Sequence, residues 1–115
     1  MKMKTIILLS DTGSQKRDYD RFGIKILKKK FNILYLDCTK WLQPTFYKNK
    51  AENDISFKEK IIIKNFKQLK KILLDQDNKI LCVIDHIGVS PKHSILEIYY
   101  KKTKNKTNFY VKFRG

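Results

Sequence analysis

The sequence predicts an α/β protein, a three-layer sandwich around a parallel, Rossmann-like sheet of about five strands. Apolar runs such as residues 5–9 and 80–84 are continuous rather than alternating, which is typical of strands covered on both faces. These runs alternate with amphipathic helical stretches, the rhythm of βαβ units. With right-handed crossovers, the expected strand order is 3-2-1-4-5.

The first βαβ unit occupies the N-terminal third of the chain. Residues 5–9 (TIILL) form the first expected strand, and residues 33–36 (ILYL), closed by Asp37, form the second. The helix between them is expected to bury one stripe and expose its lysines. The stripe consists of Tyr19, Phe22, Ile26 and Leu27.

The remaining elements follow less regularly. Residues 39–57 predict a loop with at most one helical turn, because Trp41 and Pro44 interrupt any period. A short strand at 60–63 and a helix at 66–75, capped by Asn65, come next. A strand at 80–84 and a helix starting at Ser90-Pro91 follow. The last strand begins at Asn108 and places Phe109, Val111 and Phe113 on one face.

Composition narrows the class of protein. The 115 residues, 42% of them hydrophobic, are enough for one domain with a buried core. The net charge of +15 attracts anions, but the lysines are scattered as on a solvated surface. The opening MKMKTIILLS is too short in its apolar part for a signal peptide, which favours a cytoplasmic protein. Cys38 and Cys82 read as reduced thiols, and no metal or cofactor is expected.

The expected site lies at the carboxyl ends of the strands, between the first and fourth, where the strand order reverses. Two polar loops meet there, Ser10–Arg17 and Asp85–Ser90. The candidate ligand-binding residues are Ser10, Asp11, Thr12, Gly13, Ser14, Arg17, Asp85 and Gly88. Backbone N–H groups near the helix start could hold a phosphate or a sugar. The first loop lacks the G-x-G-x-x-G and Walker A patterns, so a hydroxyl-rich turn that caps the helix is the alternative.

His86 is the candidate catalytic base. An imidazole at the predicted crevice could take a proton from a hydroxyl nucleophile. Asp85 and His86 are adjacent on a strand and should point to opposite faces, so a mutually bonded dyad is not expected. Asp37 stands where dinucleotide-binding folds place a ribose-binding acid, but the glycine fingerprint is missing.

One segment carries a resemblance to a known family. Residues 17–24 (RDYDRFGI) follow the first strand, and the helix then leads to an apolar strand ending in Asp37-Cys38-Thr39. This resembles the N-terminal pattern R-D-Y/F-x-R-F-G … Asp-x-Thr of bacterial surface-carbohydrate biosynthesis proteins of the GT-B glycosyltransferase type. The close match covers Arg17 to Thr39, and the rest of the chain matches in layout.

The resemblance implies that residues 1–115 are one Rossmann-like domain, a fragment of a larger two-domain protein and inactive alone. This acceptor-side domain would contact a sugar or lipid-linked acceptor, and a missing C-terminal domain would bind the nucleotide sugar. His86 could serve as the base, and Arg17 with neighbouring charges would anchor the first helix beside the cleft. The location implied is cytoplasmic, compatible with peripheral contact at an anionic inner membrane face.

Two other classes of function stay open. A stand-alone α/β ligand-binding or regulatory module fits the fold, but a receiver domain would need an acidic pair after the first strand, where only Asp11 stands. A basic nucleic-acid-binding module would gather lysines and exposed aromatic rings on one face. The scattered lysines make this module the least favoured.

Overall fold

A computed structural model of the chain describes residues 3–76, 79–87 and 109–112. Four parallel strands form its sheet in the order β3-β2-β1-β4. They are β1 (Thr5–Ser10), β2 (Asn32–Asp37), β3 (Lys60–Ile62) and β4 (Ile80–His86). The backbone of β5 (Phe109–Lys112) runs parallel to β4 at its outer side. The α/β class, the parallel sheet and the order 3-2-1-4 agree with the sequence prediction.

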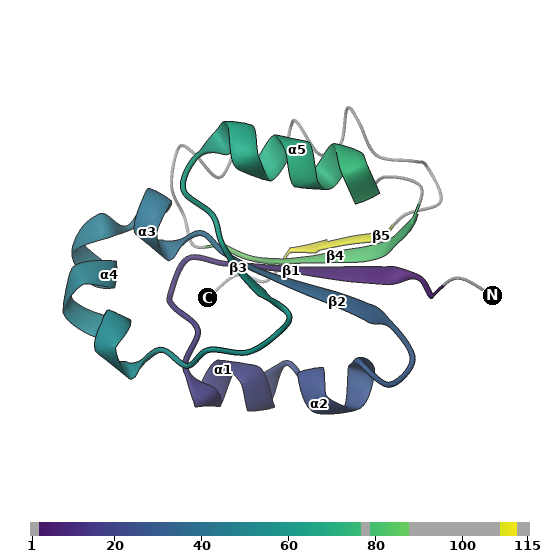
Figure 1. Cartoon of the computed structure of the whole chain (residues 1–115), viewed down its shortest axis with the longest axis horizontal. Coiled ribbons are helices and arrows are strands. Elements are labelled where there is room, and N and C mark those ends of the chain that lie inside the picture. Colours follow the sequence, from purple (N-terminus) through teal and green to yellow (C-terminus); the bar gives the residue numbers. More distant parts are fainter. Residues whose placement is uncertain (1–2, 77–78, 88–108, 113–115) are drawn as a thin grey trace.

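Helices lie on both faces of the sheet and at one end of it (Figure 1). One face carries α5 (Phe66–Gln76), and the other carries α1 (Lys16–Arg21) and α2 (Ile24–Leu27). The short helices α3 (Thr39–Leu42) and α4 (Pro44–Lys50) lie beyond the carboxyl ends of the strands. A 3₁₀ turn at Ala51–Asn53 follows. The helix expected after Ser90-Pro91 lies outside the described residues.

Alternation along the strands divides the core into two clusters. Ile7 and Leu9 of β1 pack on the α5 side, whereas Ile6 and Leu8 pack on the side of α1 and α2. The β1 burial pattern is complete, with all six residues buried. Continuous hydrophobicity therefore did indicate a strand covered on both faces.

The expected first helix is broken at Gly23, and this corrects one prediction. Gly23 has a φ of +66°, a left-handed conformation that ends α1 and restarts the chain as α2. The break changes the helical phase. Tyr19, Phe22 and Leu27 pack against the core as expected, but Ile26 is 72% exposed. The assignment of Ile26 to the buried stripe was wrong.

The segment between β2 and β3 holds more helix than predicted. Where a loop was expected, Trp41 of α3 packs against the α5-side core with its ring stacked on Phe66 at 6.3 Å. The Asn65 cap is confirmed, because Asn65 Oδ1 accepts the N–H of Gln68 at 2.8 Å. No helix among the described residues is long and apolar enough to cross a membrane.

Candidate functional site

The carboxyl ends of β1, β2 and β4 form the centre of the candidate site. The register of β1 pairs Ser10 with Asp37 on one side and with His86 on the other. Partnered residues of neighbouring parallel strands present their side chains to the same face, so these three form a row. Tyr35 precedes Asp37 by two residues and belongs to the core under α1 and α2. The row therefore faces α1, and the two loops expected to meet at this edge begin side by side.

The backbone N–H groups of the first loop are already engaged. Each of four consecutive groups donates to a side-chain oxygen of the protein. The pairs are Thr12 to Ser10 Oγ at 3.3 Å, Gly13 to Thr39 Oγ1 at 2.7 Å, Ser14 to Asp54 Oδ1 at 3.1 Å and Gln15 to Asp18 Oδ2 at 3.0 Å. A phosphate cradled by these amides would have to displace those bonds, at a cost for each buried group left unpaired.

A buried hydrogen-bond network ties this loop to the end of β2. Asp37 Oδ1 accepts both the N–H and the hydroxyl of Thr39, and Thr39 Oγ1 in turn accepts the N–H of Gly13. The carbonyl of Gly13 accepts the Tyr35 hydroxyl at 2.7 Å. Burial raises the pKa of Tyr35, so its phenol keeps the proton that it donates. The loop geometry is therefore set by β2 as much as by β1.

Carboxylates accumulate at this edge although the chain is strongly basic. Asp11 follows β1, Asp37 ends β2 and Asp85 is the last residue but one of β4, and each is at most 1% exposed. Burial raises the pKa of the Cys38 thiol, and the charges of Asp37, Asp11 and Asp85 raise it further. Two buried atoms, Asp37 Oδ2 and Ser14 Oγ, have no hydrogen-bond partner among the described residues. The edge thus favours ligands that donate hydrogen bonds over anions.

His86 and Asp85 point to opposite faces of β4, as alternation requires. The His86 imidazole is half-buried, and its centroid lies 5.6 Å from that of Phe22 in an edge-to-face contact. Asp85 is fully buried on the α5 side, where its Oδ1 accepts the N–H of Ile87 at 2.9 Å. The two side chains therefore leave β4 on opposite faces of the sheet. Gly88 lies outside the described residues.

The segment that carries the family resemblance builds the wall of the site. Asp18 is 1% exposed and binds Arg21 Nη2 at 3.1 Å, while the Arg21 guanidinium lies 5.0 Å from the Phe22 ring centre. Phe22 contacts both Tyr35 and His86 edge to face. These contacts position the residues of this segment beside the row of Ser10, Asp37 and His86 at the strand ends. Arg17, expected to bind ligand, is 71% exposed with Nε 4.0 Å from Asp18.

An open groove of about 490 Å³ adjoins the first loop. It is lined by Tyr47, Asp54, Ile55, Ser56, Phe57, Lys60 and Ile62. Burial raises the pKa of the Asp54 carboxyl. Phe57 links the groove to the core through edge-to-face contacts with Tyr19 and Tyr35, at 5.1 and 5.4 Å between centroids. Aromatic rings beside a carboxylate and an ammonium make this groove suitable for a polar ligand with an apolar face.

Sequence reasoning missed several residues of this site. Thr39, Tyr35 and Asp54 hold the first loop, yet they come from the start of α3, from β2 and from the segment before β3. The Asp-x-Thr pattern at Asp37 was a usable signal for the first of these contacts. Nothing local marks Asp54, which lies 40 residues from its partner Ser14. Among the described residues, no group of three or more histidines, cysteines and acids could hold a metal ion.

Comparison with known proteins finds no match for this chain among protein-family models, curated proteins or solved structures.

Proposed function

We propose that the chain is the acceptor-side domain of a glycosyltransferase-like protein of bacterial surface-polysaccharide synthesis. In this proposal, residues 1–115 form one Rossmann-like unit whose complete sheet has the order 3-2-1-4-5. A second domain, which binds the nucleotide sugar, completes the enzyme. The pattern at residues 17–24 supports the proposal, as does the strand order that is described. The protein would act in the cytoplasm, at the inner face of the membrane where lipid-linked acceptors are found.

The observation that carries the proposal is the combination of carboxylates and aromatic rings at the carboxyl ends of the strands. Sugar hydroxyls donate hydrogen bonds to carboxylates, and the apolar face of a sugar ring packs on aromatic side chains. Asp54, Tyr47 and Phe57 offer both features in one groove. A phosphate is disfavoured at the first loop, because the N–H groups there already donate to side chains of the protein. A sugar acceptor fits these residues better than a nucleotide does.

His86 would be the base that activates the acceptor hydroxyl. It ends β4 in register with Ser10, and its ring is held by Phe22 while remaining partly exposed. His86 is not among the residues that line the groove, so the acceptor would have to extend from the groove past Ser10 to bring a hydroxyl to the imidazole. The sugar donor would have to come from the second domain, so this chain alone should bind an acceptor without transferring sugar.

Calorimetric titration tests this proposal. The ligands are farnesyl-diphosphate-linked N-acetylglucosamine, a short lipid-linked acceptor, and UDP-N-acetylglucosamine, a donor. We expect saturable binding of the acceptor and none of the donor. Tyr47→Ala should weaken acceptor binding about tenfold by removing a ring from the groove. Lys48→Ala, an exposed change on the same helix, is the matched control.

Three results would contradict the proposal. They are tight binding of the donor, absence of binding to the acceptor by a chain that circular dichroism shows to be folded, and equal effects of the two substitutions.

A further inference from the structure

The opposite edge of the sheet carries a groove with an apolar floor and a basic rim. This groove has a volume of about 610 Å³ and lies at the amino ends of β1, β2 and β3. Phe31, Ile33 and Ile61 contribute to its floor, and Lys28, Lys29 and Lys58 line its rim. All three lysines are exposed. Glu59 is the single acid among the lining residues.

Two large aliphatic side chains near this groove are exposed, Met3 in its lining and Ile26 on α2. Ile26 is 72% exposed and Met3 is 48% exposed, although both are large apolar residues. Ile26 precedes Lys29 by three residues, and the N–H of Lys29 donates to the Ile26 carbonyl at 3.2 Å in the turn that follows α2. Lys25 is also exposed.

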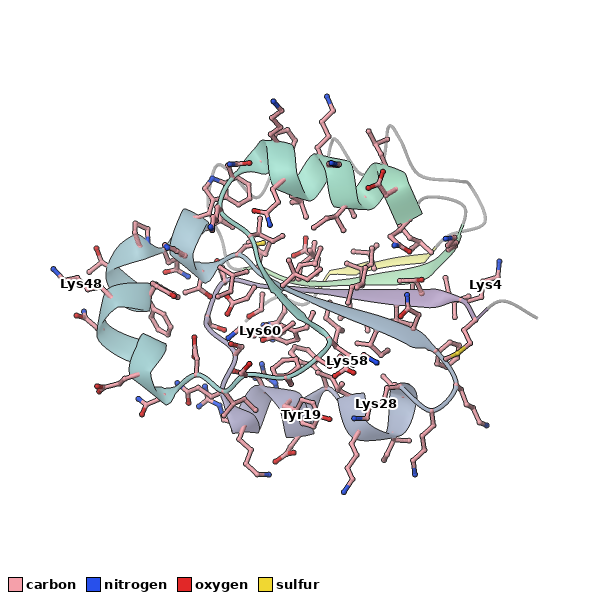
Figure 2. All side chains as sticks on the ribbon, viewed as in Figure 1. Lys4, Tyr19, Lys28, Lys48, Lys58 and Lys60 are labelled. Carbon is pink, nitrogen blue, oxygen red and sulfur yellow. The ribbon has the colours of Figure 1, made fainter. Side chains whose placement is uncertain are left out.

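Figure 2 shows the direction of this edge. Lys4 lies at the N-terminal end of β1, Lys28 and Lys58 lie below the sheet on the side of α2, and Lys48 on α4 lies at the other end of the molecule. We define the basic edge as Met3, Lys25, Ile26, Lys28, Lys29 and Lys58.

We propose that the basic edge docks on the surface of an anionic phospholipid membrane. Lysines near such a surface each contribute to binding through the negative potential of the lipid headgroups. Exposed aliphatic side chains among them can enter the boundary between headgroups and acyl chains. Ile26 and Met3 provide this apolar contact, and the long lysine stems allow their ammonium groups to remain at the headgroups.

A nucleic acid fits the basic edge less well. Single strands bind through exposed aromatic rings that stack on bases, and phosphate recognition favours arginine. The exposed large apolar residues here are Met3 and Ile26, and the charges named above are all lysines. The proposal goes beyond the sugar-acceptor function, since it concerns the edge of the sheet opposite to that groove. A chain docked through this edge would hold the groove away from the bilayer, so the acceptor sugar would have to extend from the membrane surface to reach it.

Flotation with lipid vesicles tests the proposal. The probes are vesicles of phosphatidylglycerol mixed with phosphatidylcholine, and vesicles of phosphatidylcholine alone. The wild-type chain should float with the anionic vesicles only, and added salt should release it. The triple substitution Lys28→Gln, Lys29→Gln and Lys58→Gln should weaken this binding about a hundredfold, at about fivefold for each lysine.

Two matched controls separate a defined surface from overall charge. Lys64→Gln, Lys67→Gln and Lys71→Gln remove the same three charges from exposed positions at and before α5, and should cost less than about fivefold in all. Ile26→Ser should weaken vesicle binding roughly tenfold, because it removes aliphatic carbons that would enter the membrane. Leu74 on α5 is 51% exposed, and Leu74→Ser should leave vesicle binding unchanged.

The proposal is overturned if both lysine triples weaken vesicle binding equally, or if the anionic vesicles are not bound. It is also overturned if a DNA duplex binds through the three lysines of the basic edge and the vesicles do not. Each variant changes only exposed side chains, so circular dichroism should show an unchanged fold. Acceptor binding by these variants should stay at the wild-type level, which distinguishes failure here from failure of the proposed function.

Discussion

The two edges of the sheet treat charge in opposite ways. At the carboxyl edge, Asp11, Asp37 and Asp85 are buried, and Asp37 and Asp85 each accept a hydrogen bond from a nearby backbone N–H group. At the amino edge, lysines such as Lys28 and Lys58 are exposed around an apolar groove. The net charge of +15 therefore describes the surface of the molecule but not its candidate cleft. A charge computed over the whole chain would have suggested a phosphate ligand where the local groups favour a neutral one.

If the carboxyl edge is held by its buried network, Asp37→Ala should produce the largest loss of stability. The substitution leaves the buried N–H and hydroxyl of Thr39 without their acceptor. We expect the free energy of unfolding to fall by about 3 kcal/mol, since hydrogen bonds to charged groups are the stronger ones. Urea unfolding followed by circular dichroism measures this. A loss below about 1 kcal/mol would show that the network is dispensable.

The two glycines with positive φ sharpen the comparison. At Gly13, with a φ of +92°, an added Cβ would lie 2.9 Å from Asp54 Oδ1, the acceptor of the Ser14 N–H. At Gly23 an added Cβ would meet no atom within 4 Å. Gly23→Ala should therefore lower the free energy of unfolding by about 1 kcal/mol, through backbone strain alone. Gly13→Ala should lower it by about 2 kcal/mol or more. Equal losses in urea unfolding would mean that Asp54 does not fix the loop.

Alkaline pH should act on the carboxyl edge through Cys38. Burial raises the pKa of this thiol above its ordinary 9.0, so above pH 9 the unfolded chain loses a proton that the folded chain keeps. The stabilisation is complete below pH 9 and falls as the pH rises, approaching about 1.4 kcal/mol per pH unit. Urea unfolding between pH 8 and 10 measures the slope. Cys38→Ala should flatten this pH dependence, whereas Cys82→Ala, which removes a half-exposed thiol, should leave most of it unchanged.

The smallest effect is expected at the amino edge. Lys28→Gln changes an exposed side chain of the groove rim, so the free energy of unfolding should shift by less than about 0.5 kcal/mol. The same unfolding measurement checks this value. A loss comparable to that of Asp37→Ala would mean that the lysine has a structural role, and the contrast between the two edges would then fail.

The sheet was predictable because its strands carry local signals. Residues 5–9 and 80–84 are continuous apolar runs, and β1 and β4 contain them. The break at Gly23 was not predicted, because the apolar spacing on either side of it suits one helix. A left-handed glycine shifts the phase, and the spacing does not reveal this.

The candidate site was predictable only in its location. Strand order placed Ser10 and His86 at one edge, and their register bears out that placement. The contacts that hold the first loop come from Thr39 and Asp54, which are distant in the sequence. Long-range partners of this kind depend on packing, which no local pattern encodes.

Amide chemical shifts followed during titration with farnesyl-diphosphate-linked N-acetylglucosamine would show directly which edge of the sheet binds an acceptor. This ligand carries a sugar suited to the carboxyl edge and a diphosphate that lysines would attract. We expect saturable shifts at residues 10–14, 54–57 and 86. Shifts confined to residues 25–30 and 58 would contradict it, because the ligand would then be held by charge at the opposite edge.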